Sequence, residues 1–88
     1  MCTNIVQTTP LAGVGRGAQG WFTLTSANVS YDHPFHANYD HALNIDFVNP
    51  AQGPAARVAV ELSPESARQL AETILATLAE GARYEGAA

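Results

Sequence analysis

The sequence is poor in positive charge, with no lysine among its 88 residues and only four arginines. The arginines are scattered, at Arg16, Arg57, Arg68 and Arg83, and eight acidic residues bring the formal net charge to −4. Binding to a phosphate backbone needs a cluster of basic residues on one surface. We therefore predict that nucleic acid is not a partner.

Long apolar runs are also missing. No stretch approaches the ~20 apolar residues that a membrane span requires, and the first residues, MCTNIVQTT, lack the charged-then-apolar order of a secretory signal. Cys2 is the single cysteine, so an intrachain disulfide is excluded, as expected of a reducing compartment. These absences predict a cytoplasmic protein without a membrane partner.

Charged residues make up only 14% of the chain and hydrophobic residues 47%, a balance typical of globular proteins. Much of the hydrophobic share is alanine, which buries little surface per residue. A chain of this length buries only about 60–65% of the surface that it exposes when unfolded. The composition predicts a single domain, 1–88, whose marginal core a metal ion or a second subunit would supplement.

Four segments are predicted to be β-strands, because they are rich in β-branched residues or alternate between apolar and polar residues. They cover residues 2–9, 21–29, 42–49 and 55–62. Pro10 is expected to end the first of them. A turn containing two prolines and a glycine separates the last two, which therefore form an antiparallel hairpin.

A helix is predicted over residues 63–80. Ser63 supplies the N-cap, Pro64 occupies the first helical position and Glu65 faces the positive end of the helix dipole. Gly81 is expected to end the helix. Apolar residues three or four apart form a stripe typical of a sheet-packing face: Ala67, Leu70, Ala71, Ile74, Leu75 and Leu78.

These elements predict an α+β fold, in which a small antiparallel sheet of about four strands carries one C-terminal helix packed on a face. One helix is too narrow to cover four strands. Either the sheet curls into a half-barrel or a second subunit covers the remaining apolar surface, and we predict a homodimer.

Glycines recur through residues 11–20, and Gly15 to Gly20 match the G-x-G-x-x-G pattern of dinucleotide-binding loops. That pattern works where the loop opens a helix, whereas strand-forming residues from Trp21 to Thr25 follow here. We therefore interpret residues 11–20 as a flexible Gly-rich flap or a hairpin connection, with Arg16 at its tip.

All three histidines lie in a loop predicted over residues 30–41, in which the tripeptide Tyr-Asp-His occurs twice. His33, His36 and His41 are close enough in sequence to converge on one ion. Zinc, the metal we favour, and other transition metals accept three protein ligands and keep an open position in catalytic sites. Cys2, at the start of the first predicted strand, is the candidate fourth ligand, although a lone cysteine also serves as a small apolar residue.

Two aspartates directly precede histidines, Asp32 before His33 and Asp40 before His41. A carboxylate that accepts the far ring N–H of a ligating histidine is a common outer-shell partner. Without a metal, the same pairs together with Tyr31, Tyr39 or Cys2 supply the residue types of a general base and a nucleophile. The pattern does not distinguish these roles, nor either of them from solvent-facing histidines in a polar loop.

Three stretches, MCTNIV, WFTLTSANVSYDHPFHA and HALNIDFVNP, together resemble a family of small actinobacterial proteins of unknown function. The likeness covers most of the chain up to the helix, and its most specific part is the N-terminal Cys-Thr-Asn combined with YDHPFH. No activity is established for that family, so the resemblance implies no catalytic residues.

The first hypothesis is a small metal-binding protein in which the ion acts as a Lewis acid on a small-molecule substrate held under the Gly13–Gly20 flap. The second is a metal-free homodimeric binding or assembly module, in which the histidine loop contacts a partner and the sheet face dimerises. The third is a small acid–base enzyme that uses His, Asp and Tyr without a metal. Whether the protein is an enzyme stays open at this point.

Overall fold

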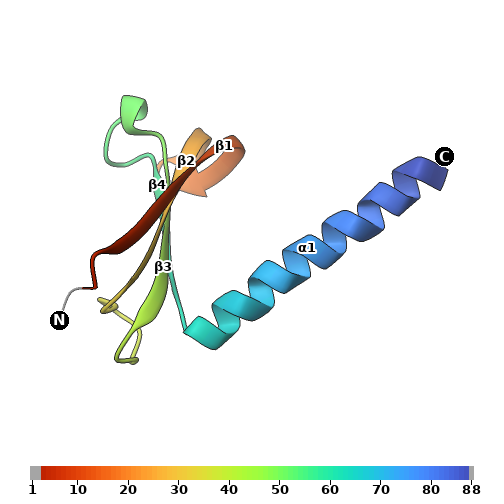
Figure 1. The fold of residues 1–88 in the computed structure, drawn as a ribbon. Coiled ribbons are helices and arrows are strands. Elements are labelled where there is room, and N and C mark those ends of the chain that lie inside the picture. The colour runs from red at the N-terminus through yellow and green to blue at the C-terminus, as the bar shows by residue number, and fades with distance from the viewer. Residues whose placement is uncertain (1–2, 88) are drawn as a thin grey trace.

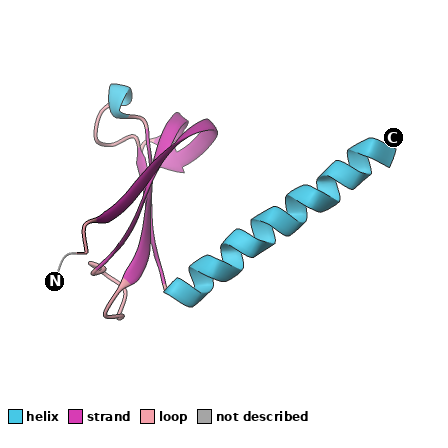
Figure 2. Cartoon of the chain, viewed as in Figure 1, coloured by secondary structure: helices cyan, strands magenta, loops and turns pink. Residues whose placement is uncertain are grey.

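A computed structural model describes residues 3–87 as a four-stranded sheet followed by one helix (Figures 1 and 2). The strands are β1 (Ile5–Gly17), β2 (Gly20–Asp32), β3 (Ala42–Val48) and β4 (Arg57–Leu62), a 3₁₀ turn covers Pro50–Gln52, and the helix is α1 (Pro64–Ala87). All neighbouring strands are antiparallel, in the order β1-β2-β3-β4. The predicted α+β fold is confirmed.

Strand β1 is longer than the predicted strand over residues 2–9, because Pro10 does not end it. Pro10 pairs with Ser26, and the register shifts between Pro10 and Gly13. A proline removes one backbone donor, which an edge strand tolerates because one of its sides has no neighbour. The irregularity after Pro10 then bends the hairpin.

Residues 11–20, interpreted from the sequence as a flexible flap or a hairpin connection, form the far end of the β1–β2 hairpin. Gly15 pairs with Phe22 and Gly17 with Gly20. A Cβ atom on Gly15 would lie 3.1 Å from Leu24 Cδ2, and one on Gly17 would lie 3.1 Å from Phe22 Cε1. Gly15 and Gly17 therefore make room for large side chains of β2.

The sheet is open but curled, and the end of β1 approaches the start of β4. Added to Gly17, a Cβ atom would lie 3.3 Å from the carbonyl oxygen of Arg57 and 3.4 Å from that of Ala55. Asn49, which is 6% exposed, holds this end of the sheet by donating from Nδ2 to the Thr23 carbonyl at 2.9 Å.

One face of the sheet is apolar, because β2, β3 and β4 alternate in phase. Leu43 pairs with Leu62, and Ile45 pairs with both Val29 and Val60. The apolar sheet face toward α1 consists of Val29, Tyr31, Leu43, Ile45 and Leu62. The opposite, polar face carries Asn44, Asp46, Arg57 and Glu61.

Helix α1 begins as predicted. The backbone N–H of Ser66 donates to Ser63 Oγ at 3.1 Å, and that of Ala67 donates to Ser63 O at 2.9 Å. The helix continues through Gly81 to Ala87, beyond the predicted end at residue 80. Glycine costs only about 1 kcal/mol relative to alanine inside a helix, and its neighbours Ala79, Glu80, Ala82 and Arg83 are good helix formers.

The helix leaves the sheet at an angle and touches β3 and β4 only near its start, so that sheet and helix form the two arms of a V (Figure 1). Among the described residues, the buried apolar side chains are those of Ala27, Ala42 and Ala56, and no large side chain is fully buried. The radius of gyration is 15.1 Å, against about 12 Å for a compact domain of this length. Residues 3–87 of the single chain thus lack a conventional core.

In the described part of the chain, no helix combines the length and the apolar character that crossing a membrane requires.

Candidate functional site

The three histidines lie between the end of β2 and the start of β3, and two of them stack. The rings of His33 and His41 have centroids 4.8 Å apart, and His41 stacks in turn on Tyr31 at 5.4 Å with the two planes parallel within 1°. His33 Nδ1 lies 2.8 Å from the carbonyl oxygen of Asp40. A carbonyl only accepts hydrogen bonds, so Nδ1 carries the proton and the stack is fixed at its His33 end.

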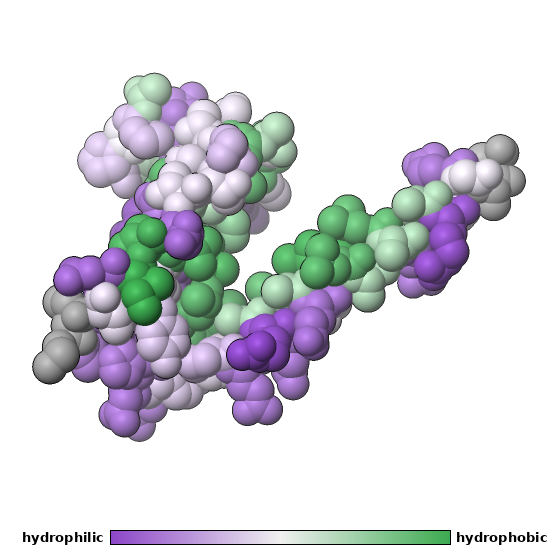
Figure 3. All heavy atoms as spheres, in the orientation of Figure 1, coloured by the Kyte–Doolittle hydropathy of each residue, from purple (hydrophilic) through white to green (hydrophobic). Residues whose placement is uncertain are grey.

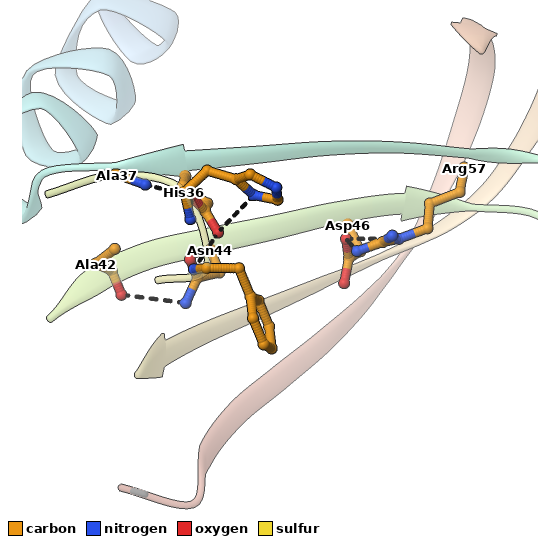
Figure 4. A network of polar contacts seen from close by, with 8 residues as sticks. His36, Ala37, Ala42, Asn44, Asp46 and Arg57 are labelled. Atoms are coloured by element: carbon orange, nitrogen blue, oxygen red, sulfur yellow. Dashed lines mark hydrogen bonds and ion pairs between the residues drawn. The ribbon is translucent and has the colours of Figure 1, made fainter. Parts of the chain in front are cut away.

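His36 belongs to a different cluster. Its side chain is 92% exposed, and its Nδ1 lies 3.8 Å from Glu61 Oε2 on β4 (Figure 4). The stack formed by Tyr31, His41 and His33 has no part in this contact. The loop therefore divides its histidines between two partners rather than gathering them around one point.

The prediction of a metal-binding protein is wrong. Within residues 3–87, no group of three or more His, Cys, Asp or Glu side chains is placed to hold a metal ion. The stacked imidazole rings of His33 and His41 do not direct their nitrogen lone pairs at a shared centre, and His36 lies apart from them beside Glu61. For these reasons, the closeness of the three histidines in sequence does not produce a metal site. Cys2, the predicted fourth ligand, lies outside the described residues.

The hydrogen bonds of the two aspartates beside the histidines each involve one backbone group. Asp32 Oδ1 accepts a hydrogen bond of 2.7 Å from the backbone N–H of His33. Asp40 contacts His33 through its carbonyl oxygen. Tyr31 lies on the apolar sheet face and Tyr39 is half exposed in the loop. The four candidate catalytic residues are thus spread over the loop and two sides of the sheet.

Glu61 is the residue of this region that the sequence analysis missed. Its Oε2 accepts a hydrogen bond from the backbone N–H of Phe35 at 2.7 Å, while Oε1 accepts from those of His36 at 2.9 Å and Ala37 at 2.8 Å (Figure 4). One carboxylate on a strand therefore satisfies three consecutive backbone donors of the loop. It pins the loop on the polar face and leaves Phe35 94% exposed.

These bonds lower the pKa of Glu61 below its ordinary value of 4.5. The largest cause is the hydrogen bond from Phe35, followed by that from Ala37; desolvation opposes them, and the bond and the charge of His36 add smaller effects. In the sequence, the only signal for this role of Glu61 is an acidic residue on the polar side of an alternating strand. Its partners lie at least 24 residues away in sequence, so no local pattern identifies them.

A pocket of about 420 Å³ lies on the same face, between the pinned loop and β3 and β4. At one end Arg57 donates to Asp46 Oδ1 from Nε at 2.9 Å and from Nη2 at 2.6 Å. At the other end Asn44 donates from Nδ2 to the Ala42 carbonyl at 3.5 Å, whereas its buried Oδ1 has no hydrogen-bond partner among the described residues. The pocket thus holds paired charges and one unsatisfied acceptor.

An apolar cleft of about 560 Å³ lies between the arms of the V. We call it the wedge. The apolar sheet face lines one side, and Pro64, Ala67, Arg68, Leu70, Ala71 and Ile74 of α1 line the other. Figure 3 shows hydrophobic residues along the side of α1 that faces the sheet and hydrophilic residues on its opposite side. Both walls are apolar surfaces of the kind that folded proteins normally cover.

No curated protein and no solved structure matches this chain. The model of a protein family, described as a family of unknown function (DUF6295), matches residues 1–88. The match extends over the wedge, the pinned loop and the histidine stack alike, and it agrees with the resemblance noted from the sequence. The chain therefore belongs to the family of unknown function DUF6295.

Proposed function

We propose that this protein functions as a homodimeric assembly module, in which a second copy of the chain covers the wedge. The single observation that carries the proposal is the missing core: among residues 3–87 no large side chain is fully buried, while Leu75 and Leu78 of α1 are 67% and 64% exposed. A chain this size gains its stability mainly from burying such side chains, at about 1.5–3 kcal/mol each.

The exposed area has the size that a stable dimer needs. A compact monomer of 9.3 kDa exposes about 5,000 Å², whereas this chain exposes 6677 Å². If each of two copies buried the excess of about 1,700 Å², the interface would total about 3,400 Å². That total lies in the range of obligate homodimers, which have more hydrophobic interfaces than transient complexes.

A second copy is the occupant that the surface fits best. Both walls of the wedge are apolar, so the helix of one chain offers the surface that the sheet of another lacks. A two-fold axis then covers both wedges at once, which is the advantage of an isologous interface. We also propose a cytoplasmic location, which the single cysteine of the chain favours.

The test is a pair of charge substitutions on α1. Leu78→Glu places a carboxylate in the proposed interface, and Leu78 does not line the wedge of its own chain. Gln69→Glu adds the same charge to the exposed polar side of the helix. We expect Leu78→Glu to weaken dimerisation by roughly a hundredfold or more, because a buried unpaired charge costs about 3 kcal/mol or more.

Size-exclusion chromatography with light scattering measures the outcome. Gln69→Glu should retain the dimer of the unmodified protein, and Leu78→Glu should elute as a monomer at the same concentration. Equal masses for all three proteins would contradict the proposal, as would a monomeric unmodified protein.

A further inference from the structure

The apolar stripe of α1 extends farther than its own sheet reaches. Exposure rises along the helix, from 44% at Leu70 and 50% at Ile74 to 78% at Tyr84. Ile74 is the last helical residue that lines the wedge. About 13 residues follow it, which span about 20 Å at the rise of an α-helix. This distal part of the stripe needs a surface that its own chain does not offer.

The joint between sheet and helix is short and constrained. Only Ser63 separates β4 from α1. Its Oγ and its carbonyl oxygen both cap the helix, at 3.1 Å from Ser66 N and 2.9 Å from Ala67 N. Pro64 fixes its own φ angle and restricts the conformation of Ser63. Ser63 is thus tied to the helix at two atoms, and this joint holds α1 at its angle to the sheet.

Resting on the proposed function, we infer that the two chains exchange helices: each α1 passes over the apolar sheet face of the other chain, and the two helices lie antiparallel with Ile74 near the two-fold axis. The distal half of each helix then packs on the sheet of the partner chain, because the partner's own helix points away from that sheet. The wedge of each chain is filled by the helix of its partner.

The spacing of the stripe supports Ile74 as the centre. An antiparallel pair centred there sets Leu70 opposite Leu78 of the partner subunit and Ala67 opposite Gly81 of the partner subunit. Large residues thus meet large ones, and two small residues allow the helices to approach closely at each end of the seam. A parallel pair would set every charged residue against its own copy, and it would carry both distal halves away from the sheets.

Cysteine crosslinking tests this arrangement in a chain whose native thiol is removed by Cys2→Ser. Residues facing each other across two packed helices fall within the Cα separation that a disulfide accepts. Under mild oxidation we expect Ile74→Cys to convert most of the protein to a covalent dimer. Gln69→Cys, on the opposite side of α1, is the matched control and should stay uncrosslinked.

A second pair fixes the direction of the helices. Chains carrying Leu70→Cys and Leu78→Cys, co-expressed with different tags, should crosslink to each other more completely than either does to itself. Light scattering of the unmodified protein distinguishes failure of the proposed function from failure of the helix exchange alone. A monomer would overturn the proposed function and the exchange together. A dimer in which Ile74→Cys crosslinks no better than Gln69→Cys would overturn the exchange alone.

Discussion

Glu61 on β4 and Phe35 in the loop before β3 are joined by a hydrogen bond of 2.7 Å from the Phe35 backbone N–H to Oε2 of the carboxylate. With the bonds from His36 and Ala37 to the other oxygen, this contact fixes the loop to the sheet. The loop that contains every histidine is therefore held by a residue of the last strand.

Replacing Glu61 should loosen the loop at the three residues whose backbone N–H groups bond to its carboxylate. Glu61→Ala removes all three acceptor bonds, so the amide protons of Phe35, His36 and Ala37 should exchange faster with solvent. In Glu61→Gln, the one remaining oxygen can still accept from His36 and Ala37, whereas the NH₂ group that replaces the other oxygen cannot accept from Phe35. Amide exchange should therefore rise most at Phe35. Hydrogen exchange followed by NMR measures both variants. Glu72→Gln on α1 is the charge-matched control, and equal protection in Glu61→Ala and the unmodified protein would contradict the assignment.

The lowered pKa of Glu61 makes stability depend on pH in one direction. The folded pKa lies below the unfolded value, so the unfolded chain binds more protons between the two values. The contribution of Glu61 is fully present above about pH 4.5 and is lost as pH falls through the lower folded value. Urea midpoints between pH 7 and pH 3 should fall more steeply for the unmodified protein than for Glu61→Gln. Parallel curves would exclude this role.

Two glycine substitutions test the curled hairpin. Gly17→Ala should destabilise the fold by about 1–3 kcal/mol, because the added methyl would meet Phe22 and the carbonyl oxygen of Arg57 at 3.1 and 3.3 Å. Nothing lies within 4 Å of a Cβ atom at Gly13, so Gly13→Ala should be neutral or stabilise by about 0.4–1 kcal/mol. Chemical denaturation gives both values. Similar effects at the two positions would mean that β1 does not approach β4 as described.

Asn49 should be the most sensitive polar residue outside the loop. It is 6% exposed, and its side chain bonds to the Thr23 carbonyl across the sheet. Asn49→Ala leaves that carbonyl without its partner and should cost about 1–3 kcal/mol of unfolding free energy. Gln52→Ala, at an exposed position of the neighbouring 3₁₀ turn, should change stability by less than about 0.5 kcal/mol. Equal costs would show that the Asn49 bond contributes nothing.

Local rules predicted the strands and the helix start well. Alternation in LNIDF and RVAVEL identifies β3 and β4, and Ser63 with Pro64 marks the start of α1, because these signals depend on neighbouring residues alone. Pro10 and Gly81 were both expected to end an element and do not. Pro10 is tolerated because β1 is an edge strand, and Gly81 costs the helix only about 1 kcal/mol.

The site was harder to predict, because its contacts join distant parts of the chain. Clustering of His33, His36 and His41 in sequence indicated a metal centre, yet ring stacking and the reach of Glu61 from β4 divide them. Likewise the stripe on α1 was recognised as apolar, but periodicity does not specify which sheet it covers. The direction of the helix depends on the joint at Ser63, and that is a property of the folded chain.

The dependence of stability on chain concentration tests the central claim most directly, that a second copy supplies the missing core. Urea unfolding is followed at a series of concentrations spanning a factor of about 100. If folding and dimerisation are coupled, the apparent stability per dimer should fall by about 2.8 kcal/mol from the highest concentration to the lowest, since each tenfold dilution is worth about 1.4 kcal/mol. A midpoint that stays constant over the whole series would contradict the account, because the single chain would then be stable by itself.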